Sequence, residues 1–194
     1  MSRCIQRPWL VSMADDGSMS SHMQRITLVG YRASGKTTIA RALAQRLRWP
    51  WVDVDEMIVR VAGAPIPDLF AQYGEGGFRD WESRCLGLAF AENPPQIIAT
   101  GGGIVERSQN RSMLSKPEAG MVCYLEAPVQ VLQQRLRQHC GDRPSLSGNQ
   151  HPADELPPIL ARRDPWYRAV ADCMVDATQP QEAVVEEIIR SFYD

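Results

Sequence analysis

A glycine-rich segment near the start of the chain has the residue types and spacing of a phosphate-binding site. Residues 30–37 read Gly-Tyr-Arg-Ala-Ser-Gly-Lys-Thr, which matches the pattern G-x-x-x-x-G-K-[ST]. An apolar run at 26–29 precedes the segment and a helix-like run at 38–47 follows it, as this motif requires. The glycines let successive backbone N–H groups face phosphate oxygens, and the start of the helix adds partial positive charge. The sequence therefore predicts that the chain binds a nucleoside triphosphate.

Two side chains of this loop have separate expected roles. We expect Lys36 to reach the β- and γ-phosphates and Thr37 to ligate Mg²⁺ through its hydroxyl. The residues expected to line the nucleotide site here are Gly30, Arg32, Ala33, Ser34, Gly35, Lys36, Thr37 and Thr38.

The composition favours one well-formed domain and excludes several classes of partner and site. A chain of 194 residues, 44% of them hydrophobic, is long enough for one well-formed core. Its net charge of −2 argues against nucleic acid as the main partner. The five cysteines form no C-x-x-C pair, which argues against a zinc site or disulfide scaffold and suits a reducing cytoplasm. No apolar stretch approaches the roughly 20 residues of a membrane span, so we expect no membrane partner. We also expect a cytoplasmic protein that is a monomer, although the sequence itself does not determine the oligomeric state.

The first 22 residues differ from the rest of the chain. They contain a Ser-Met-Ser-Ser patch and no sustained hydrophobic period. We interpret residues 1–22 as a disordered tail, an expression artefact, or the product of a start site placed too far upstream of Met23. Residues 23–194 are expected to form a single domain.

Strand-like and helix-like segments alternate through residues 23–194. Apolar, β-rich runs predict strands at 26–29, 51–53, 96–100, 121–125 and 173–175. Helical patterns predict helices at 38–47, 54–61, 68–73, 78–89, 107–116, 128–137, 160–167 and 181–193. Residues 139–158 form the one long irregular segment in this interpretation. This order predicts an α/β protein with three α/β/α layers and a mainly parallel sheet.

Two aspartates follow the second predicted strand. We expect Asp53 to hold a metal-bound water beside Thr37, and Asp55 to accept a hydrogen bond from an acceptor hydroxyl. The alternative is that Asp55 only caps a helix and Asp53 is a solvated surface residue.

Three consecutive glycines follow the third predicted strand. Residues Gly101, Gly102 and Gly103 carry no side chains, so a ligand can lie against their backbone. The alternative is a flexible turn. The carboxyl ends of parallel strands gather at one edge of a sheet, so the three glycines, the aspartates and the phosphate loop are expected to share one site.

Three arginines are candidates for binding an anionic acceptor and the phosphates. Arg79 begins a helical run, where Glu82 at i+3 can hold it in place. Arg163 provides a second guanidinium, and two arginines on one carboxylate give bidentate recognition. Arg143 lies in the irregular segment, where a lid would bring it onto the γ-phosphate. Taken singly, residues such as Arg79 and Arg163 are more often ordinary surface or ion-pair arginines, and without a lid Arg143 is a solvated loop charge.

The combination of these motifs resembles the shikimate kinase family, within the wider nucleoside-monophosphate-kinase-like group. The resemblance covers about residue 24 to the C-terminus. It rests on the 30–37 loop, Asp53-Val54-Asp55, Phe78-Arg79 with Glu82, Gly101-Gly102-Gly103, Arg143-Pro144, and Arg163 followed by Pro165-Trp166-Tyr167.

This resemblance implies a P-loop kinase fold with a five-stranded parallel sheet, a lid at about 138–158 and a small substrate-binding helical region. It also implies MgATP-dependent phosphorylation of the 3-hydroxyl of shikimate, in aromatic amino acid (chorismate) biosynthesis. By motif position, the shikimate-binding residues are Asp55, Arg79, Gly101, Gly102, Gly103 and Arg163. Those that serve catalysis are Lys36, Asp55 and Arg143, and those that serve the metal are Thr37 and Asp53. Arg137 or Arg135 is expected to stack on adenine, with Gln179-Pro180 on its other side.

The chain departs from the family pattern at three places. Ser145-Leu146 replaces the usual Leu-Leu, Ala169 replaces a common Glu, and Gly76-Gly77 replaces small alanines. No charged group of the expected chemistry is lost.

Two other functions remain open from the sequence. A gluconate-type sugar-acid kinase would share the loop, the fold and the arginines. A non-catalytic ATP-binding module would bind the nucleotide without acceptor-dependent turnover.

Overall fold

The computed structural model describes residues 24–93, 95–138 and 151–194. The predicted tail at 1–22 lies outside these residues, as do Arg143 and most of the predicted lid. Among the described residues, no helix is both long and apolar enough to cross a membrane.

Five parallel strands form one sheet, as the sequence predicted. They are β1 (Arg25–Val29), β2 (Trp51–Asp53), β3 (Gln96–Ala99), β4 (Met121–Glu126) and β5 (Cys173–Asp176), in the order β2-β3-β1-β4-β5. The central strand β1 pairs Leu28 with Ala99 on one side and with Cys123 on the other. All five residues of β1 are buried, as expected for a parallel sheet covered on both faces.

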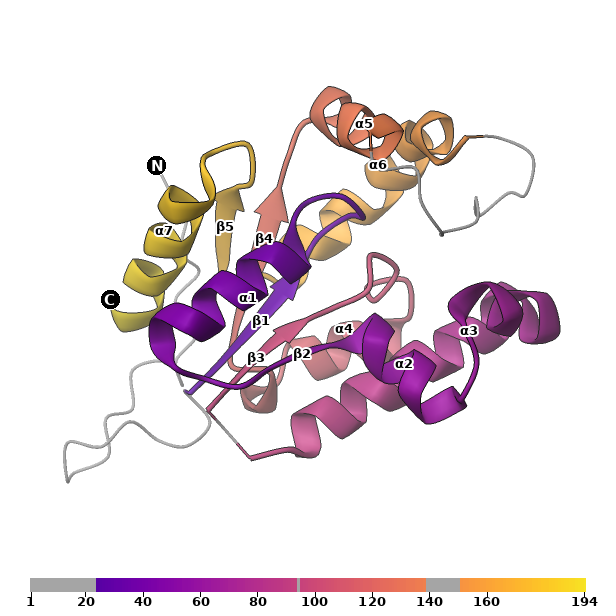
Figure 1. The fold of residues 1–194 in the computed structure, drawn as a ribbon, viewed down its shortest axis with the longest axis horizontal. Helices are drawn as coiled ribbons and strands as arrows, with labels where there is room; N and C mark the ends of the chain where they lie inside the picture. The colour runs from indigo at the N-terminus through magenta and orange to yellow at the C-terminus, as the bar shows by residue number, and fades with distance from the viewer. Residues whose placement is uncertain (1–23, 94, 139–150) are drawn as a thin grey trace.

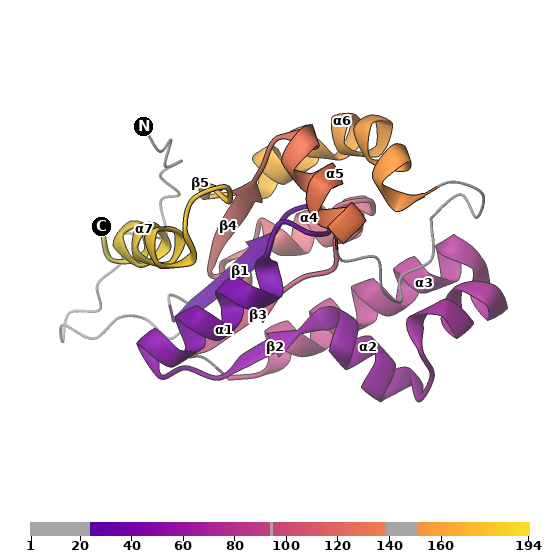
Figure 2. The same ribbon diagram turned by 45° about the horizontal axis from the view of Figure 1, so that its top comes forward.

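Helices cover both faces of the sheet and give the three predicted layers (Figure 1). They are α1 (Lys36–Leu47), α2 (Val54–Ala62), α3 (Ile66–Ala91), α4 (Ser108–Leu114), α5 (Val129–Gln138), α6 (Pro152–Val170) and α7 (Gln181–Tyr193), with a 3₁₀ turn at Pro117–Ala119. Helices α1 and α7 pack together on one face, whereas α3, α4 and α6 lie on the other. The pairs α2–α3 and α5–α6 extend past the carboxyl ends of the strands (Figure 2).

Helix α3 joins two of the predicted helices across a kink. The backbone of Gly74 has φ 67° and ψ −176°, which no helix contains, so two helical segments meet there. Gly77 lies in the second segment, where an added Cβ would be 2.4 Å from Cβ of Tyr73. The predicted break is therefore present and lies at Gly74, and Gly77 allows close packing beyond it.

Helix α6 begins at Pro152, so the prediction of an irregular segment through residue 158 was wrong for 152–158. Pro157 and Pro158 inside the helix led to that error, because proline provides no N–H for a helical hydrogen bond. The Ala153 carbonyl, four residues before Pro157, instead accepts from Nε2 of Gln133 on α5 at 2.9 Å. His151 is the N-cap of this helix, and its Nδ1 accepts from the N–H of Ala153 at 3.1 Å. A side chain from α5 therefore supports a helix that local propensity disfavours.

Two groups of buried apolar side chains make the core. The larger surrounds the sheet, with Leu28, Leu43 and Leu86 among its fully buried members. The smaller joins α2 and α3 to β3 through Ile58, Cys85 and Ile98. This second group packs the α2–α3 pair, which carries Asp55 and Arg79, against β3.

Gly120 precedes β4 in a backbone conformation that other residues cannot take without cost. Its φ is +65°, and an added Cβ would lie 2.2 Å from the carbonyl oxygen of Arg25. Gly63 has a similar φ of +70° at the end of α2 but has nothing within 4 Å of such a Cβ. We predict that Gly63→Ala lowers the free energy of unfolding by about 1 kcal/mol, from backbone strain alone. Gly120→Ala should lower it by about 3 kcal/mol or more, since a steric clash adds to the strain.

Urea unfolding of the two variants and the wild type measures this difference. Equal losses in the two variants would show that the contact with Arg25 does not contribute.

Candidate active site

The phosphate-binding loop lies between β1 and α1, at the carboxyl edge of the sheet. Gly35 is the N-cap of α1, with φ 95°, and no side chain caps the first N–H groups of the helix, as an anion-binding helix start requires. An added Cβ on Gly30 would lie 2.9 Å from the Leu125 carbonyl oxygen, so the loop passes directly against the end of β4. Nζ of Lys36 donates to the carbonyls of Gly30 and Tyr31 at 2.9 and 2.8 Å. Lys36 is therefore held within the loop where the motif predicts the phosphates.

Asp53 joins this loop to the start of α2. Its Oδ2 accepts from the Thr37 hydroxyl at 2.7 Å, and its Oδ1 accepts from the N–H groups of Asp55 and Glu56 at 2.9 and 3.4 Å. Asp53 is thus the N-cap of α2 and is buried, so the alternative of Asp55 as the cap and Asp53 as a surface residue was wrong. The juxtaposition of Asp53 and Thr37 that the sequence predicted is present.

Asp55 points toward the end of β3 and there approaches Glu82. An added Cβ on Gly101 would lie 2.7 Å from Oδ1 of Asp55 and 2.8 Å from Oε1 of Glu82. Both carboxylates therefore flank the same backbone position, and only glycine leaves room for them. Asp55 is buried at 8% exposure and Glu82 at 1%.

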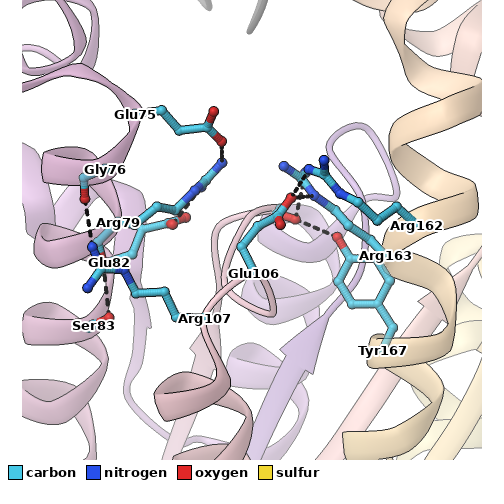
Figure 3. A network of polar contacts seen from close by, with 11 residues as sticks. Glu75, Gly76, Arg79, Glu82, Ser83, Glu106, Arg107, Arg162, Arg163 and Tyr167 are labelled. Atoms are coloured by element: carbon cyan, nitrogen blue, oxygen red, sulfur yellow. Dashed lines mark hydrogen bonds and ion pairs between the residues drawn. The ribbon is translucent and has the colours of Figure 1, made fainter.

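Arg79 lies on the α3 side of the three-glycine loop (Figure 3). Its Nη1 donates to Glu82 at 2.6 Å, as the i+3 spacing predicted, and its Nη2 donates to Glu75 at 2.8 Å. An added Cβ on Gly103 would lie 1.7 Å from Nη1 of Arg79. The guanidinium therefore rests directly on the Gly103 backbone, and any side chain at this position would displace it.

Arg163 lies on the α6 side of the same loop (Figure 3). Its Nε donates to Glu106 at 2.6 Å and its Nη1 donates to the Gly102 carbonyl at 3.1 Å. Its guanidinium also lies 5.6 Å from the ring centre of Tyr31 in the phosphate loop. The hydroxyl of Tyr167, one helical turn further on, donates to the same Gly102 carbonyl. Both candidate arginines thus contact one backbone segment, from opposite sides.

Three polar residues of this site were not singled out from the sequence as members of it. Glu75 precedes Arg79 by four residues and Tyr167 follows Arg163 by four, and both spacings are helical neighbours that a search of the pattern would find. Glu106 had no such signal, because its partners lie about 57 residues away on α6.

The candidate adenine residues separate in the structure. Arg135 on α5 donates to the carbonyl of Ala33 in the phosphate loop at 3.3 Å and to that of Ala177 at 2.8 Å. Ala177 follows β5, where Gln179 and Pro180 lead into α7. Arg137 instead donates to Asp154 of α6 at 3.0 Å and is exposed. Arg135 therefore joins the two segments expected around the base, whereas Arg137 faces the beginning of α6.

The electrostatics of the acceptor side centre on Glu82. Burial raises the pKa of its carboxyl to about 7, and the charge of Asp55 adds to this, although the charge of Arg79 and a hydrogen bond from it oppose the rise. Arg79 itself is desolvated by burial, yet its contacts with Glu82 and Glu75 raise its pKa, so it stays charged. One guanidinium thus faces several carboxylates, and the most buried of them binds a proton near neutral pH.

This arrangement predicts a pH-dependent contribution of Glu82 to stability. Its pKa is about 7 in the folded protein, against 4.5 for the free group, so folding strengthens proton binding. The associated stability is complete below about pH 4.5 and is lost as the pH rises through about 7. Relative to Glu82→Gln, the free energy of unfolding of the wild type should fall by roughly 2–3 kcal/mol between about pH 5 and pH 8.

Urea unfolding of both proteins at several pH values across this interval measures the difference. Groups that titrate equally in both proteins cancel in the difference. If the free energies of unfolding of the wild type and Glu82→Gln changed in parallel with pH, the raised pKa of Glu82 would be ruled out.

Comparisons with known proteins are consistent with this geometry. The sequence profile of the shikimate kinase family matches residues 32–193. A shikimate kinase from Oleidesulfovibrio alaskensis is 45% identical and covers 87% of this chain and 96% of its own length. One from Nitratidesulfovibrio vulgaris is 42% identical, over 88% of this chain and 96% of its own.

Solved structures give the same result. Shikimate kinase from Acinetobacter baumannii, in complex with shikimate, matches with a TM-score of 0.78 and 35% identity, covering 86% of this chain and 90% of its own. A gluconokinase from Sinorhizobium meliloti matches with a TM-score of 0.53 and 16% identity, covering 87% and 91%, which reflects the shared fold alone. On the extent of these matches, the chain belongs to the shikimate kinase family.

Proposed function

We propose that this protein transfers the γ-phosphoryl group of ATP to the 3-hydroxyl of shikimate, as a step of aromatic amino acid (chorismate) biosynthesis. The observation that carries the proposal is the pair of buried arginines, Arg79 and Arg163, on opposite sides of the Gly101–Gly103 loop. Two guanidiniums so placed suit an acceptor that bears one carboxylate, and the family match names a carboxylate-bearing acceptor.

The acceptor carboxylate binds between Arg79 and Arg163 in this proposal, with its ring against the glycine backbone. Asp55 accepts the hydrogen bond of the reacting hydroxyl and so aims it at the γ-phosphorus. The hydroxyl oxygen then bonds to that phosphorus while its proton passes to the Asp55 carboxylate. The bond from phosphorus to the β,γ-bridging oxygen breaks, and ADP leaves with that electron pair. Asp55 suits this task because it lies beside Gly101, at the edge of the sheet where the phosphate loop also ends.

The nucleotide phosphates bind the loop N–H groups at the start of α1. Lys36 turns from the carbonyls of Gly30 and Tyr31 to the β- and γ-phosphates, which are stronger acceptors for its ammonium. We include Arg143 on the γ-phosphate on sequence grounds alone. For adenine we propose Arg135 in place of Arg137, because its contacts join the phosphate loop to the segment before Gln179 and Pro180.

Mg²⁺ fits the donor set at Thr37 and Asp53. Both provide oxygen, the ligand that Mg²⁺ prefers, and the two oxygens already lie 2.7 Å apart. Mg²⁺ keeps several of its waters when it binds a protein, so two side-chain oxygens beside the phosphates are enough to hold it. When bound, Mg²⁺ would neutralise charge on the β- and γ-phosphates.

Neither alternative gains support. The likeness to a gluconokinase reflects the fold and leaves the acceptor unassigned. A non-catalytic module has no need for Asp55, Arg79 and Arg163 to be buried around one backbone segment.

The direct test is release of ADP from MgATP with shikimate, with gluconate and with no acceptor. We predict turnover with shikimate alone, and its loss when the divalent cation is chelated. Turnover with gluconate would overturn the acceptor assignment and keep the phosphate chemistry. ATP binding without turnover on either acid would favour the non-catalytic module.

The carboxylate role of Arg79 has its own test. We predict that Arg79→Lys raises the KM for shikimate by about tenfold or more, because a point charge cannot reproduce the planar fork that binds a carboxylate. The KM for ATP should change by less than about twofold, since Arg79 makes no contact with the phosphate loop among those described.

Initial rates with each substrate varied separately give both constants. Arg84→Lys on the same helix is a matched control, because Arg84 stacks on Trp81 outside the site. An equal rise in both KM values for Arg79→Lys would remove Arg79 from the carboxylate site.

A further inference from the structure

Glu106 places a carboxylate on one of the two arginines assigned to the acceptor. Its Oε1 accepts from Nε of Arg163 and from Nη2 of Arg162, each at 2.6 Å. The side chain of Arg163 is 3% exposed and that of Glu106 15%, so this contact is shielded from solvent, whereas Arg162 is 56% exposed. A buried positive charge intended for a ligand is thus partly neutralised from within the protein (Figure 3).

The carboxylate of Glu106 is ionised at neutral pH. Burial acts to raise its pKa, but the hydrogen bonds and charges of Arg163 and Arg162 outweigh burial and hold the pKa below its ordinary value. Glu106 therefore carries a full negative charge beside the acceptor site.

The backbone around Glu106 is fixed on several sides. Its N–H donates to the Gly103 carbonyl at 2.9 Å, and its carbonyl accepts from Arg111 at 2.9 Å. Arg111 in turn stacks on Trp166 of α6. The neighbouring Arg107 donates to the Gly76 carbonyl and pairs with Asp80 on α3. With its backbone so held, the Glu106 carboxylate stays close to Arg163 when a ligand arrives.

One guanidinium nitrogen of Arg163 is left without a protein partner in the described part of the chain. Its Nε is taken by Glu106 and its Nη1 donates to Gly102, while Nη2 is buried and has no hydrogen-bond partner among the described residues. A buried donor without a partner is costly, so this atom is the natural contact for an acceptor carboxylate. Nε and Nη2 lie on the same edge of a guanidinium, so the acceptor carboxylate would bind beside that of Glu106.

We infer that Glu106 sets the affinity for the acceptor through two opposing effects, and this rests on the proposed function. Its hydrogen bond orients Arg163, while its charge repels the acceptor carboxylate. Arg162 offsets that charge from the solvent side. Glu106 is thus a positioning residue: it holds Arg163 in place and at the same time lowers the affinity for the acceptor.

Two substitutions separate the two effects. Glu106→Gln keeps a side-chain oxygen for Nε of Arg163 but removes the charge, so shikimate should bind more tightly. Glu106→Ala removes the charge and the hydrogen bond together, so its gain should be smaller than that of Gln or absent. We expect Glu106→Gln to lower both the dissociation constant and the KM for shikimate by about three- to tenfold. Its kcat and its KM for ATP should stay within about twofold.

Calorimetric titration with shikimate, without nucleotide, gives the dissociation constant independently of turnover. Glu186→Gln is the matched control, because Glu186 is exposed on α7, over the other face of the sheet from α6. This control should leave all constants unchanged. Unfolding midpoints of the variants identify any general loss of structure.

Arg162 provides the second arm of the test. Arg162→Gln should weaken shikimate binding by about threefold in the wild-type background, since the charge of Glu106 is then less compensated. In the Glu106→Gln background the same change should have a smaller effect. This difference measures the coupling between residues 106 and 162.

Each contrary outcome has a distinct meaning. Weaker binding in Glu106→Gln, or an unchanged constant, overturns this inference while shikimate turnover by the wild type keeps the proposed function. An equal effect of Arg162→Gln in both backgrounds overturns the compensating role of Arg162. A wild-type protein that does not bind shikimate overturns the proposed function, and this inference with it.

Discussion

The absence of side chains at Gly101–Gly103 is the steric constraint on which the acceptor site depends. The Arg79 guanidinium lies where a Cβ of Gly103 would be, and the Asp55 carboxylate lies where a Cβ of Gly101 would touch it. On the opposite side, the Gly102 carbonyl accepts from Arg163. One backbone segment therefore contacts side chains from α2 and α3 and also from α6, which is far from them in the sequence.

Charge balance is the second property of this site. Arg79 faces Glu75 and Glu82, and Arg163 faces Glu106, so each guanidinium is already paired before an acceptor binds. Pairing avoids the large cost of an isolated buried charge. It also means that an acceptor carboxylate must compete with, or bind beside, internal carboxylates. The affinity for an acceptor therefore depends on the small difference between how strongly the arginines bind the acceptor carboxylate and how strongly they bind the internal ones. A change at a single internal carboxylate can alter this difference.

The sequence predicted the sheet, the layers and the phosphate loop because each depends on local pattern. Strands that alternate with helices form a parallel sheet whatever the individual side chains are, and the loop motif is a contiguous segment. The start of α6 was not predictable in this way, since Pro157 and Pro158 disfavour a helix locally and Gln133 on another helix compensates. Glu106 was missed for the same physical reason, as its partners come together only in the folded chain.

The three-residue segment from Asp53 to Asp55 joins the two halves of the site. Asp53 ends β2 and its carboxylate receives the Thr37 hydroxyl of the nucleotide side while it caps α2. Asp55 is the second residue of α2, and its carboxylate lies beside Gly101. Because the strand gives way to the helix between them, the two carboxylates diverge although they are two residues apart. The capping hydrogen bonds of Asp53 tie the start of α2 to the end of β2, so they also set the distance between the phosphate loop and Asp55, the residue proposed to hold the acceptor hydroxyl.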